Sequence, residues 1–228
     1  MRFAFYFATR EVHAEKTSAH KSLIKIKKVL PNIDLFYDTK NSTGLSVNYN
    51  NFLNTHKNSY DYLVFLHDDV FVDDLNVCNK LTEAHKTFDI VGLAGGLNPT
   101  IQEPALWHLM CGGFGGGNLR GAVAHPAGPD SIAMTSFGIT PCRVAVLDGL
   151  FLSICTTSIK KAQWEFNENY DFHHYDIASC IDANRKRLKL GVAPIWVIHS
   201  SPGLLNINDK RFTDSQAKFI SEYSKLVV

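Results

Sequence analysis

Two adjacent carboxylates and a histidine give this sequence its strongest chemical signal. His67, Asp68 and Asp69 directly follow an unbroken apolar run, YLVFL at residues 62–66. Such a run is typical of a buried strand, and ligands of open α/β sheets bind at the carboxyl ends of the strands. Adjacent carboxylates in a partly dry cleft repel each other, and a divalent cation shared with a diphosphate relieves that repulsion. The pattern therefore indicates either a metal and diphosphate site or an Asp that caps the following turn.

A second histidine could join this site from a distant part of the chain. His199 follows a predicted strand at residues 192–198 and begins the sequence HSSPG. If that strand ends at the same edge of the sheet, its imidazole would lie beside the carboxylates. A mixed nitrogen and oxygen ligand set suits Mn²⁺ better than Mg²⁺. The alternative is a histidine with a purely structural role.

The third candidate is Asp176, in the sequence FHHYD at residues 172–176. It falls at the start of a predicted helix, where a carboxylate can cap the chain and is favoured by the helix dipole. The functional alternative is a general base beside an acceptor hydroxyl, with a pKa tuned by its surroundings. The aromatic and imidazole side chains around it could form the wall that sugar recognition uses.

The elements that must position these residues alternate between strands and helices. Short apolar runs and amphipathic patterns together indicate an α/β domain with a mainly parallel sheet. The predicted strands are 3–8, 33–37, 62–66, 90–94, 143–147, 150–154 and 192–198. The predicted helices are 17–30, 44–55, 75–88, 175–190 and 213–226, with Gly191 as the stop signal of the fourth.

Residues 92–141 differ in composition from the rest of the chain, because most of the 15 glycines lie there. The segment has too few charges for a solvated linker and too many glycines for helices, so we expect ordered loops and short strands beside a ligand. Its GGFGGG run at 112–117 lacks the GxxxxGK[ST] pattern of a phosphate-binding loop. We expect a mobile lid or acceptor loop there, with a structural turn cluster as the alternative.

Composition limits the class of protein. A chain of 228 residues with 45% hydrophobic residues fits one domain with a sizeable core. Its 23 basic and 22 acidic residues leave a charge of +1, which gives no general attraction for nucleic acid or an anionic membrane. No apolar run approaches the ~20 residues that span a bilayer, and the five cysteines form no CxxC pair. We therefore expect a soluble, cytoplasmic protein with reduced thiols and no transmembrane segment.

The order of the motifs resembles that of bacterial and viral GT-A glycosyltransferases related to family 2. The motifs of the donor half are GLS (44–46) with YN (49–50), DYLVFLHDDV (61–70), FDIVG (88–92) and AGG (94–96). Those of the acceptor half are LDGLF (147–151), FNE (166–168), HHYD (173–176) and VIHSSPG (197–203). Two positions depart from the usual pattern: Asn167 replaces an Asp, and His174 replaces an aromatic residue. Neither departure removes a proposed catalytic group.

The resemblance implies a single GT-A domain, with a Rossmann-like, mixed and mainly parallel sheet flanked by helices. It divides the chain into a nucleotide-sugar-binding half (1–96), an acceptor and catalytic half (97–205) and a C-terminal helix (206–228). The implied reaction is metal-dependent and inverting, and moves a sugar from a nucleoside-diphosphate sugar to an acceptor hydroxyl. Mn²⁺ or Mg²⁺ is the implied cofactor and a UDP-sugar the favoured donor. The implied acceptor is a glycan, a lipid-linked molecule or a protein.

The resemblance also implies roles for individual residues. Asp69 is favoured as the direct metal ligand, and Asp68 lies nearer the ribose or diphosphate. Asp176 matches the base of inverting members. The implied metal ligands are Asp69, Asp68 and His199. The implied donor contacts are Thr9, Asp38, Asn50 and Asp68. The implied acceptor contacts are Trp107, Asp148, His173 and His174.

Two other functions compete with this interpretation. A catalytically silent sugar- or nucleotide-binding module would keep the fold without the activity, but the joint presence of Asp69, Asp176 and His199 argues against it. A metal-dependent hydrolase would use a metal-bound water and would release free sugar without an acceptor. A sugar-nucleotide pyrophosphorylase is disfavoured, because ATRE at residues 8–11 replaces the Gly-, Arg- and Lys-containing loop that it needs.

Overall fold

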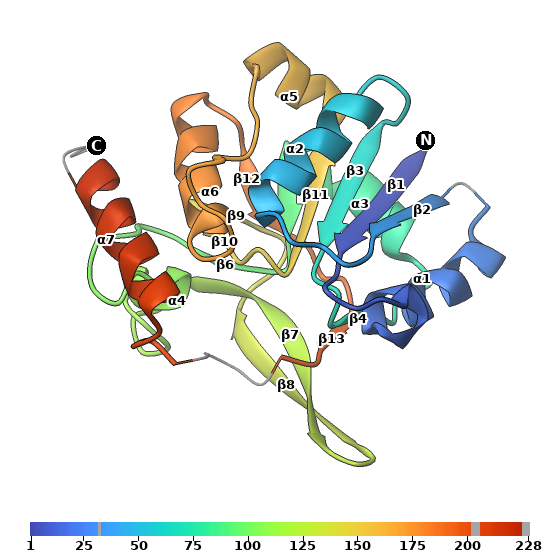
Figure 1. Ribbon diagram of the computed structural model, residues 1–228, viewed down its shortest axis with the longest axis horizontal. Coiled ribbons are helices and arrows are strands. Elements are labelled where there is room, and N and C mark those ends of the chain that lie inside the picture. Colours follow the sequence, from blue (N-terminus) through green and yellow to red (C-terminus); the bar gives the residue numbers. More distant parts are fainter. Residues whose placement is uncertain (32, 202–205, 225–228) are drawn as a thin grey trace.

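The computed structural model describes residues 1–31, 33–201 and 206–224, and its centre is a seven-stranded sheet (Figure 1). The strands, in spatial order, are β2 (Ile33–Asp38), β1 (Phe3–Ala8), β3 (Tyr62–Leu66), β11 (Phe151–Cys155), β5 (Ile90–Gly92), β12 (Leu190–Val192) and β9 (Cys142–Val144). Strands β11 and β9 run against the other five. The sheet is therefore mixed and mainly parallel, as the sequence predicts.

Helices pack around this sheet (Figure 1). They are α1 (Ser18–Val29), α2 (Leu45–His56), α3 (Val77–Ala84), α5 (Thr156–Ala162), α6 (Tyr175–Arg185) and α7 (Lys210–Tyr223), with a short η1 (Ala14–Lys16). Because β2 and β3 lie on opposite sides of β1, right-handed crossovers carry α1 and α2 to opposite faces. The start of α1 is capped by the Thr17 side chain, which accepts a hydrogen bond from the His20 N–H, and Leu23 and Ile26 bury its apolar face.

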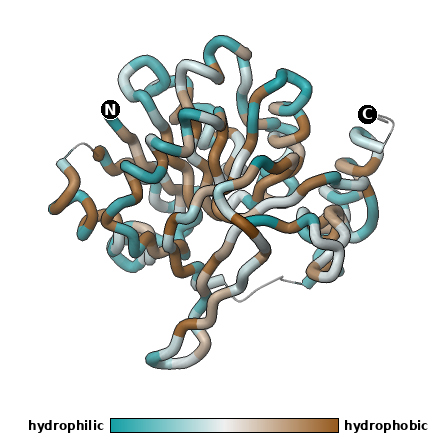
Figure 2. Tube along the Cα trace, turned by 180° about the vertical axis from the view of Figure 1, so that it is seen from behind, coloured by the Kyte–Doolittle hydropathy of each residue, from teal (hydrophilic) through white to brown (hydrophobic). Residues whose placement is uncertain are grey.

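A second, smaller sheet lies beside the first and carries a long hairpin. Its strands, in spatial order, are β10 (Val146–Leu147), β6 (Ala94–Gly96), β7 (Leu119–Gly128), β13 (Val197–His199) and β4 (Val70–Val72), and β8 (Ser131–Gly138) pairs with β7. The β7–β8 hairpin projects from the layered body (Figure 1). Hydrophobic residues are concentrated within that body, whereas its outer helices and loops are largely hydrophilic (Figure 2).

Three apolar runs predicted as single strands each belong to both sheets. Residues 90–94 divide into β5 and β6 at Leu93, and residues 143–147 divide into β9 and β10 at Ala145. Residues 192–198 begin at the last residue of β12 and end within β13. The crossing brings backbones unusually close, since a Cβ on Gly95 would lie 2.3 Å from the carbonyl oxygen of Val146. A periodicity of two describes a strand but not the sheet to which it belongs, so the sequence could not show these crossings.

The remaining predictions need smaller corrections. The predicted helix 175–190 ends at Arg185, and Gly191 lies inside β12 instead of stopping that helix. Residues 75–88 form only the shorter α3, and α5 was not predicted. The glycine-rich segment contains the β7–β8 hairpin and a short helix, α4 (Trp107–Met110), in place of loops and short strands alone. The predicted end of α7 at residues 225–226 lies outside the described residues.

Two expectations from composition can be compared with the structure. The cysteines lie apart as free thiols. Among residues 1–31, 33–201 and 206–224, none of the helices is both long and apolar enough to cross a membrane.

Candidate functional site

The turn between β3 and β4 presents the three polar residues of the strongest motif. Strand β3 is buried along its whole length, and the chain turns where the Val70 N–H donates to the His67 carbonyl at 3.2 Å. Strand β4 then pairs antiparallel with β13, which sets His199 opposite Val70. The Ser200 N–H donates to the Asp69 carbonyl at 3.0 Å. The pairing of these two short strands therefore brings His199 to the aspartates from 130 residues along the chain, as the sequence suggests.

His67, Asp69 and His199 form a group that could hold a metal ion. Each offers one ligand atom, and these atoms all lie within 4.8 Å of one another. Oδ1 of Asp69 is buried 3.3 Å from Nε2 of His199, yet it has no hydrogen-bond partner among the residues that the structure describes. A buried carboxylate oxygen without a hydrogen-bond donor is costly, and a cation would satisfy it. Two imidazoles and a carboxylate therefore fit a divalent ion such as Mn²⁺.

His67 is the member of this group that the sequence analysis missed. The chain turns at residues 67–70, and this turn, not the alternation of an extended strand, brings His67 and Asp69 into one group. No alternation of residue types marks such a turn, so the residue pattern could not select His67 over Asp68. In the structure Oδ2 of Asp68 accepts a hydrogen bond from the Thr9 hydroxyl at 2.5 Å, away from the group.

The charges of the group suit metal binding at neutral pH. Burial acts to raise the pKa of Asp69, but contact with His199 and the charge of His67 lower it below its usual value. Burial lowers the pKa of His67, against the opposing effect of Asp69. The Tyr175 hydroxyl donates to the Gly149 carbonyl at 3.0 Å and lies 3.0 Å from Nε2 of His67, so that Nε2 must carry the proton. The remaining nitrogen of neutral His67 keeps the lone pair that a metal needs.

Asp176 lies in the first turn of α6, but it is not the residue that begins the helix. His174 is the N-cap, with a φ of +65°, and its side chain makes no capping hydrogen bond. Oδ1 of Asp176 accepts from the Ile177 N–H at 2.9 Å, and Oδ2 accepts from the Gly149 N–H at 3.0 Å. Burial and, secondly, the charge of Asp148 raise the pKa of Asp176 to about 7. A carboxylate with this pKa is suited to take up a proton near neutral pH.

Asp148 links this carboxylate to Trp107. Its Oδ2 accepts a hydrogen bond from Nε1 of Trp107 at 2.8 Å, and its Oδ1 accepts from the Leu150 N–H at 3.0 Å. Two of the predicted acceptor contacts are thus bonded to each other and lie beside Asp176. The turn LDG between β10 and β11 holds Asp148 and Gly149 in this position.

Three of the predicted donor contacts meet at the carboxyl ends of neighbouring parallel strands. The Thr9 hydroxyl donates to Asp68, and the Thr9 N–H donates to the Asp38 carbonyl at 2.8 Å. The Tyr6 hydroxyl donates to Oδ2 of Asp38 at 2.6 Å. Since β1, β2 and β3 lie side by side, Thr9, Asp38 and Asp68 come together at the edge where ligands of such sheets bind.

Asn50 has other partners. It is 3% exposed, and its Oδ1 accepts from the Phe166 N–H at 2.8 Å. Its Nδ2 donates to the Phe166 carbonyl and to Oε1 of Glu168, both at 2.9 Å. The amide is therefore occupied in tying α2 to the 166–168 segment, and this corrects the expectation that it contacts a donor.

His174 and His173 face α7. His174 is 5% exposed, its Nδ1 lies 2.8 Å from the Ser215 hydroxyl, and its ring centroid lies 4.9 Å from that of Phe212. Burial lowers the pKa of His174 to about 4. The carbonyl of half-buried His173 accepts from the same Ser215 hydroxyl at 3.0 Å. His174 therefore docks α7 in place of the acceptor contact expected of it, while the His173 ring stays partly exposed.

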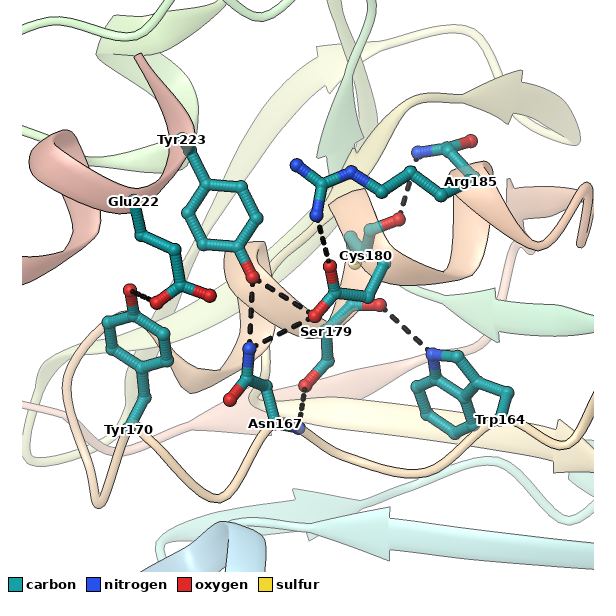
Figure 3. A network of polar contacts seen from close by, with 10 residues as sticks. Trp164, Asn167, Tyr170, Ser179, Cys180, Arg185, Glu222 and Tyr223 are labelled. Atoms are coloured by element: carbon teal, nitrogen blue, oxygen red, sulfur yellow. Dashed lines mark hydrogen bonds and ion pairs between the residues drawn. The ribbon is translucent and has the colours of Figure 1, made fainter. Parts of the chain in front are cut away.

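Asn167 belongs to a polar network that holds α7 against α6 (Figure 3). Its Nδ2 donates to Oδ2 of Asp182 and to the Tyr223 hydroxyl, each at 3.0 Å, and the Tyr223 hydroxyl donates to the same carboxylate at 3.0 Å. Nearby, the Tyr170 hydroxyl donates to Glu222 at 2.9 Å. We call these five residues the anchor cluster. An Asp at position 167 would place a second carboxylate beside that of Asp182.

Comparisons with known proteins identify the family and the type of fold. A family model described as "Glycosyltransferase like family" matches residues 31–223. The structure of A197 from STIV is 12% identical, with a TM-score of 0.51 over 92% of this chain and 100% of that one. The structure of S. aureus TarS is 12% identical, with a TM-score of 0.54 over 100% of this chain and 40% of that one. A search of the curated proteins gives no match. These likenesses confirm the expected mixed α/β fold of the GT-A type.

Proposed function

This chain belongs to the glycosyltransferase-like family whose model matches residues 31–223, and on that premise we propose that it transfers a sugar from a nucleoside-diphosphate sugar to an acceptor hydroxyl. We propose further that the reaction depends on a divalent metal and inverts the anomeric centre. The observation that carries the proposal is a run of three hydrogen bonds. They join His67 to the Tyr175 hydroxyl, that hydroxyl to the Gly149 carbonyl, and the Gly149 N–H to Asp176. A candidate metal ligand and a candidate base are thus fixed relative to each other by a few short contacts.

The donor would lie along the ends of β1, β2 and β3. Asp38, Thr9 and Asp68 offer carboxylate and hydroxyl groups to the nucleoside and ribose, and a UDP-sugar is the donor that we favour. His67, Asp69 and His199 would hold Mn²⁺ or Mg²⁺, which when bound supplies positive charge for the departing diphosphate. Asp68 lies between these two sets, since its neighbour Thr9 contacts the Asp38 backbone. Metal and nucleotide binding should therefore be coupled.

Asp176 is the proposed general base. It would accept the proton of the acceptor hydroxyl as the hydroxyl oxygen forms its bond to the anomeric carbon. The bond from that carbon to the diphosphate oxygen breaks on the opposite side, and the nucleoside diphosphate departs with the electron pair. The configuration at the anomeric carbon is thereby inverted. Asp148 favours the proton transfer, because its charge makes the protonated form of Asp176 more stable.

Replacing the metal ligand tests the donor half of the proposal. In Asp69→Asn the nucleotide loses the Mn²⁺-dependent part of its affinity, because the amide oxygen carries no charge to hold the ion. Titration calorimetry with UDP, with and without Mn²⁺, measures this directly. Asp73→Asn is the matched control, since Asp73 is an exposed carboxylate just beyond β4. An unchanged metal dependence in Asp69→Asn would contradict the assignment.

The same preparations separate transfer from hydrolysis. A transferase releases sugar from UDP-glucose or UDP-N-acetylglucosamine slowly until an acceptor is added, whereas a hydrolase releases it at full rate with water. A protein that binds UDP but does neither is a silent binding module.

A further inference from the structure

The GGFGGG run holds an aromatic ring out into solvent. Phe114 is 68% exposed, although most large apolar side chains of this chain are buried. The backbone around it is hydrogen-bonded: the Gly113 N–H donates to the His108 carbonyl at 2.9 Å, and the Gly116 N–H donates to the Gly113 carbonyl at 3.2 Å. At its other end Nη1 of Arg120 donates to the Gly117 carbonyl at 2.8 Å. The segment is therefore a hydrogen-bonded turn that presents one ring.

That ring is joined to the candidate site by a series of aromatic contacts. Phe114 stacks on Phe137, with ring centroids 5.6 Å apart and planes at 28°. Phe137 meets Trp107 edge to face at 5.1 Å, and Nε1 of Trp107 donates to Asp148 at 2.8 Å. Asp148 is the carboxylate whose charge raises the pKa of Asp176. The exposed ring thus lies at the outer end of a wall whose inner end borders the proposed base.

We infer that Phe114 binds a sugar unit of the acceptor, and that the acceptor is an oligosaccharide. The inference rests on the proposed transfer to a hydroxyl beside Asp176. The face of an aromatic ring carries negative charge density, which attracts the slightly positive C–H groups on the apolar face of a pyranose. The half-buried His108 ring lies 6.1 Å from Phe114 and can hydrogen-bond to sugar hydroxyls at the rim.

The glycines beside Phe114 support this occupant. A Cβ at Gly115 or Gly117 would meet nothing within 4 Å, but only Gly115 is free of a backbone requirement, because a φ of +68° favours glycine at 117. They leave the approach to the ring free of side chains, as a flat ligand requires. Two rings, Phe137 and Trp107, stand between Phe114 and Asp148. Phe114 therefore contacts a unit further along the acceptor than the unit that receives the sugar, and a disaccharide is the shortest acceptor that uses both positions.

Saturation-transfer NMR tests the inference with cellobiose, lactose and N,N′-diacetylchitobiose as probes, in the presence of UDP and Mg²⁺ so that no paramagnetic ion is present. The wild-type protein should bind at least one disaccharide, with the strongest transfer to ring C–H protons. Phe114→Ala should weaken that binding about tenfold, the range of one aromatic contact. Methyl glucoside should bind equally to both proteins, because the inner position is unchanged.

Ile132→Ala is the matched control, because Ile132 is an exposed apolar residue of β8 near the tip of the hairpin. It should leave disaccharide binding unchanged. The inference is overturned if no disaccharide binds to the wild-type protein or if Phe114→Ala binds it as tightly. UDP affinity is read separately: its absence in the wild-type protein would count against the proposed function, whereas normal UDP affinity with no effect of Phe114→Ala counts against this inference alone.

Discussion

The two ends of α6 carry the same residue type in opposite surroundings. Near its end Asp182 receives three donors: Asn167 and Tyr223 at 3.0 Å, and Nη1 of Arg185 at 2.9 Å. At its start Asp176 accepts from the backbone N–H groups of Ile177 and Gly149, and burial together with the nearby carboxylate of Asp148 raises its pKa to about 7. The anchor cluster supplies every charge with a partner. In the candidate site the charge of Asp176 lies near that of Asp148, and binding a proton or a ligand would reduce their repulsion.

The comparison separates structural from functional carboxylates by their partners. A carboxylate that accepts several hydrogen bonds from side chains stabilises the fold, and it gains nothing by binding a proton. A carboxylate held near another one is less stable in its charged form, and that instability can drive proton uptake. Asp69 fits neither kind: burial acts to raise its pKa, but contact of its Oδ1 with His199 keeps that pKa below the usual value.

Removing the base should give the largest effect. In Asp176→Asn an amide replaces the carboxylate and has no useful basicity, so we expect sugar transfer to slow by about 10² to 10⁴-fold. UDP affinity should stay near the wild-type value, because the proposed nucleotide site lies at the ends of other strands. Initial transfer rates and UDP titrations of the two proteins check this. Asp130→Asn is the control, an exposed carboxylate at the hairpin turn, and full activity in Asp176→Asn would remove this residue from the mechanism.

Placing a second carboxylate in the anchor cluster should give an effect on stability alone. Asn167→Asp replaces the donor to Asp182 with a like charge, and we expect it to cost about 1–3 kcal/mol. The melting temperature should fall by several degrees for a chain of this size. Asn169→Asp, at an exposed position of the same loop, should leave the melting temperature unchanged. A variant that transfers slowly but melts normally would show that the cluster is functional, and the contrast between the two ends of α6 would fail.

The third prediction concerns the dependence of stability on pH. The pKa of Asp176 is raised on folding from the usual ~3.9 to about 7. The folded state then holds this proton more tightly than the unfolded state, which stabilises the fold below pH ~4, and that contribution is lost as the pH rises through about 7. Asp176→Asn does not titrate, so its stability relative to the wild-type protein should rise between these limits and then level off. Urea unfolding at pH 4 to 8 measures the difference, and a constant difference would mean that Asp176 titrates normally.

Much of the layered architecture could be predicted, because a strand that is buried on both faces has a continuous apolar sequence. Strands β1 and β3 have the predicted bounds, and α1 differs by one residue at each end. The divided runs at Leu93 and Ala145 could not be predicted, since sheet membership depends on partners far along the chain. The β7–β8 hairpin was missed because its exposed strand lacks the alternation that a buried face produces.

The candidate site shows the same division. His199 lies beside Asp69 as expected but for another reason, because β13 belongs to the second sheet and pairs there with β4, a strand that was not predicted. The roles expected of Asn50 and His174 do not hold, because their partners, Phe166 and the residues of α7, are brought to them by tertiary packing. Pro202 and Gly203 of the HSSPG motif lie outside the described residues. His67 belongs with Asn50 and His174, because a turn at residues 67–70, and not an alternating strand, brings it to Asp69.

The position of β11 between β3 and β5 has a consequence for synthesis of the chain on the ribosome. β3 ends at Leu66 and β5 at Gly92, but the strand that joins them spans Phe151–Cys155. At about 5–20 residues per second, roughly 5 to 20 s separate the emergence of β3 from that of its neighbour. During that interval the nascent chain exposes the open edge of an apolar strand, which is the surface that chaperones bind and that aggregation uses. The arrival of β11, which joins β3 to β5, is therefore the step that ends this exposure.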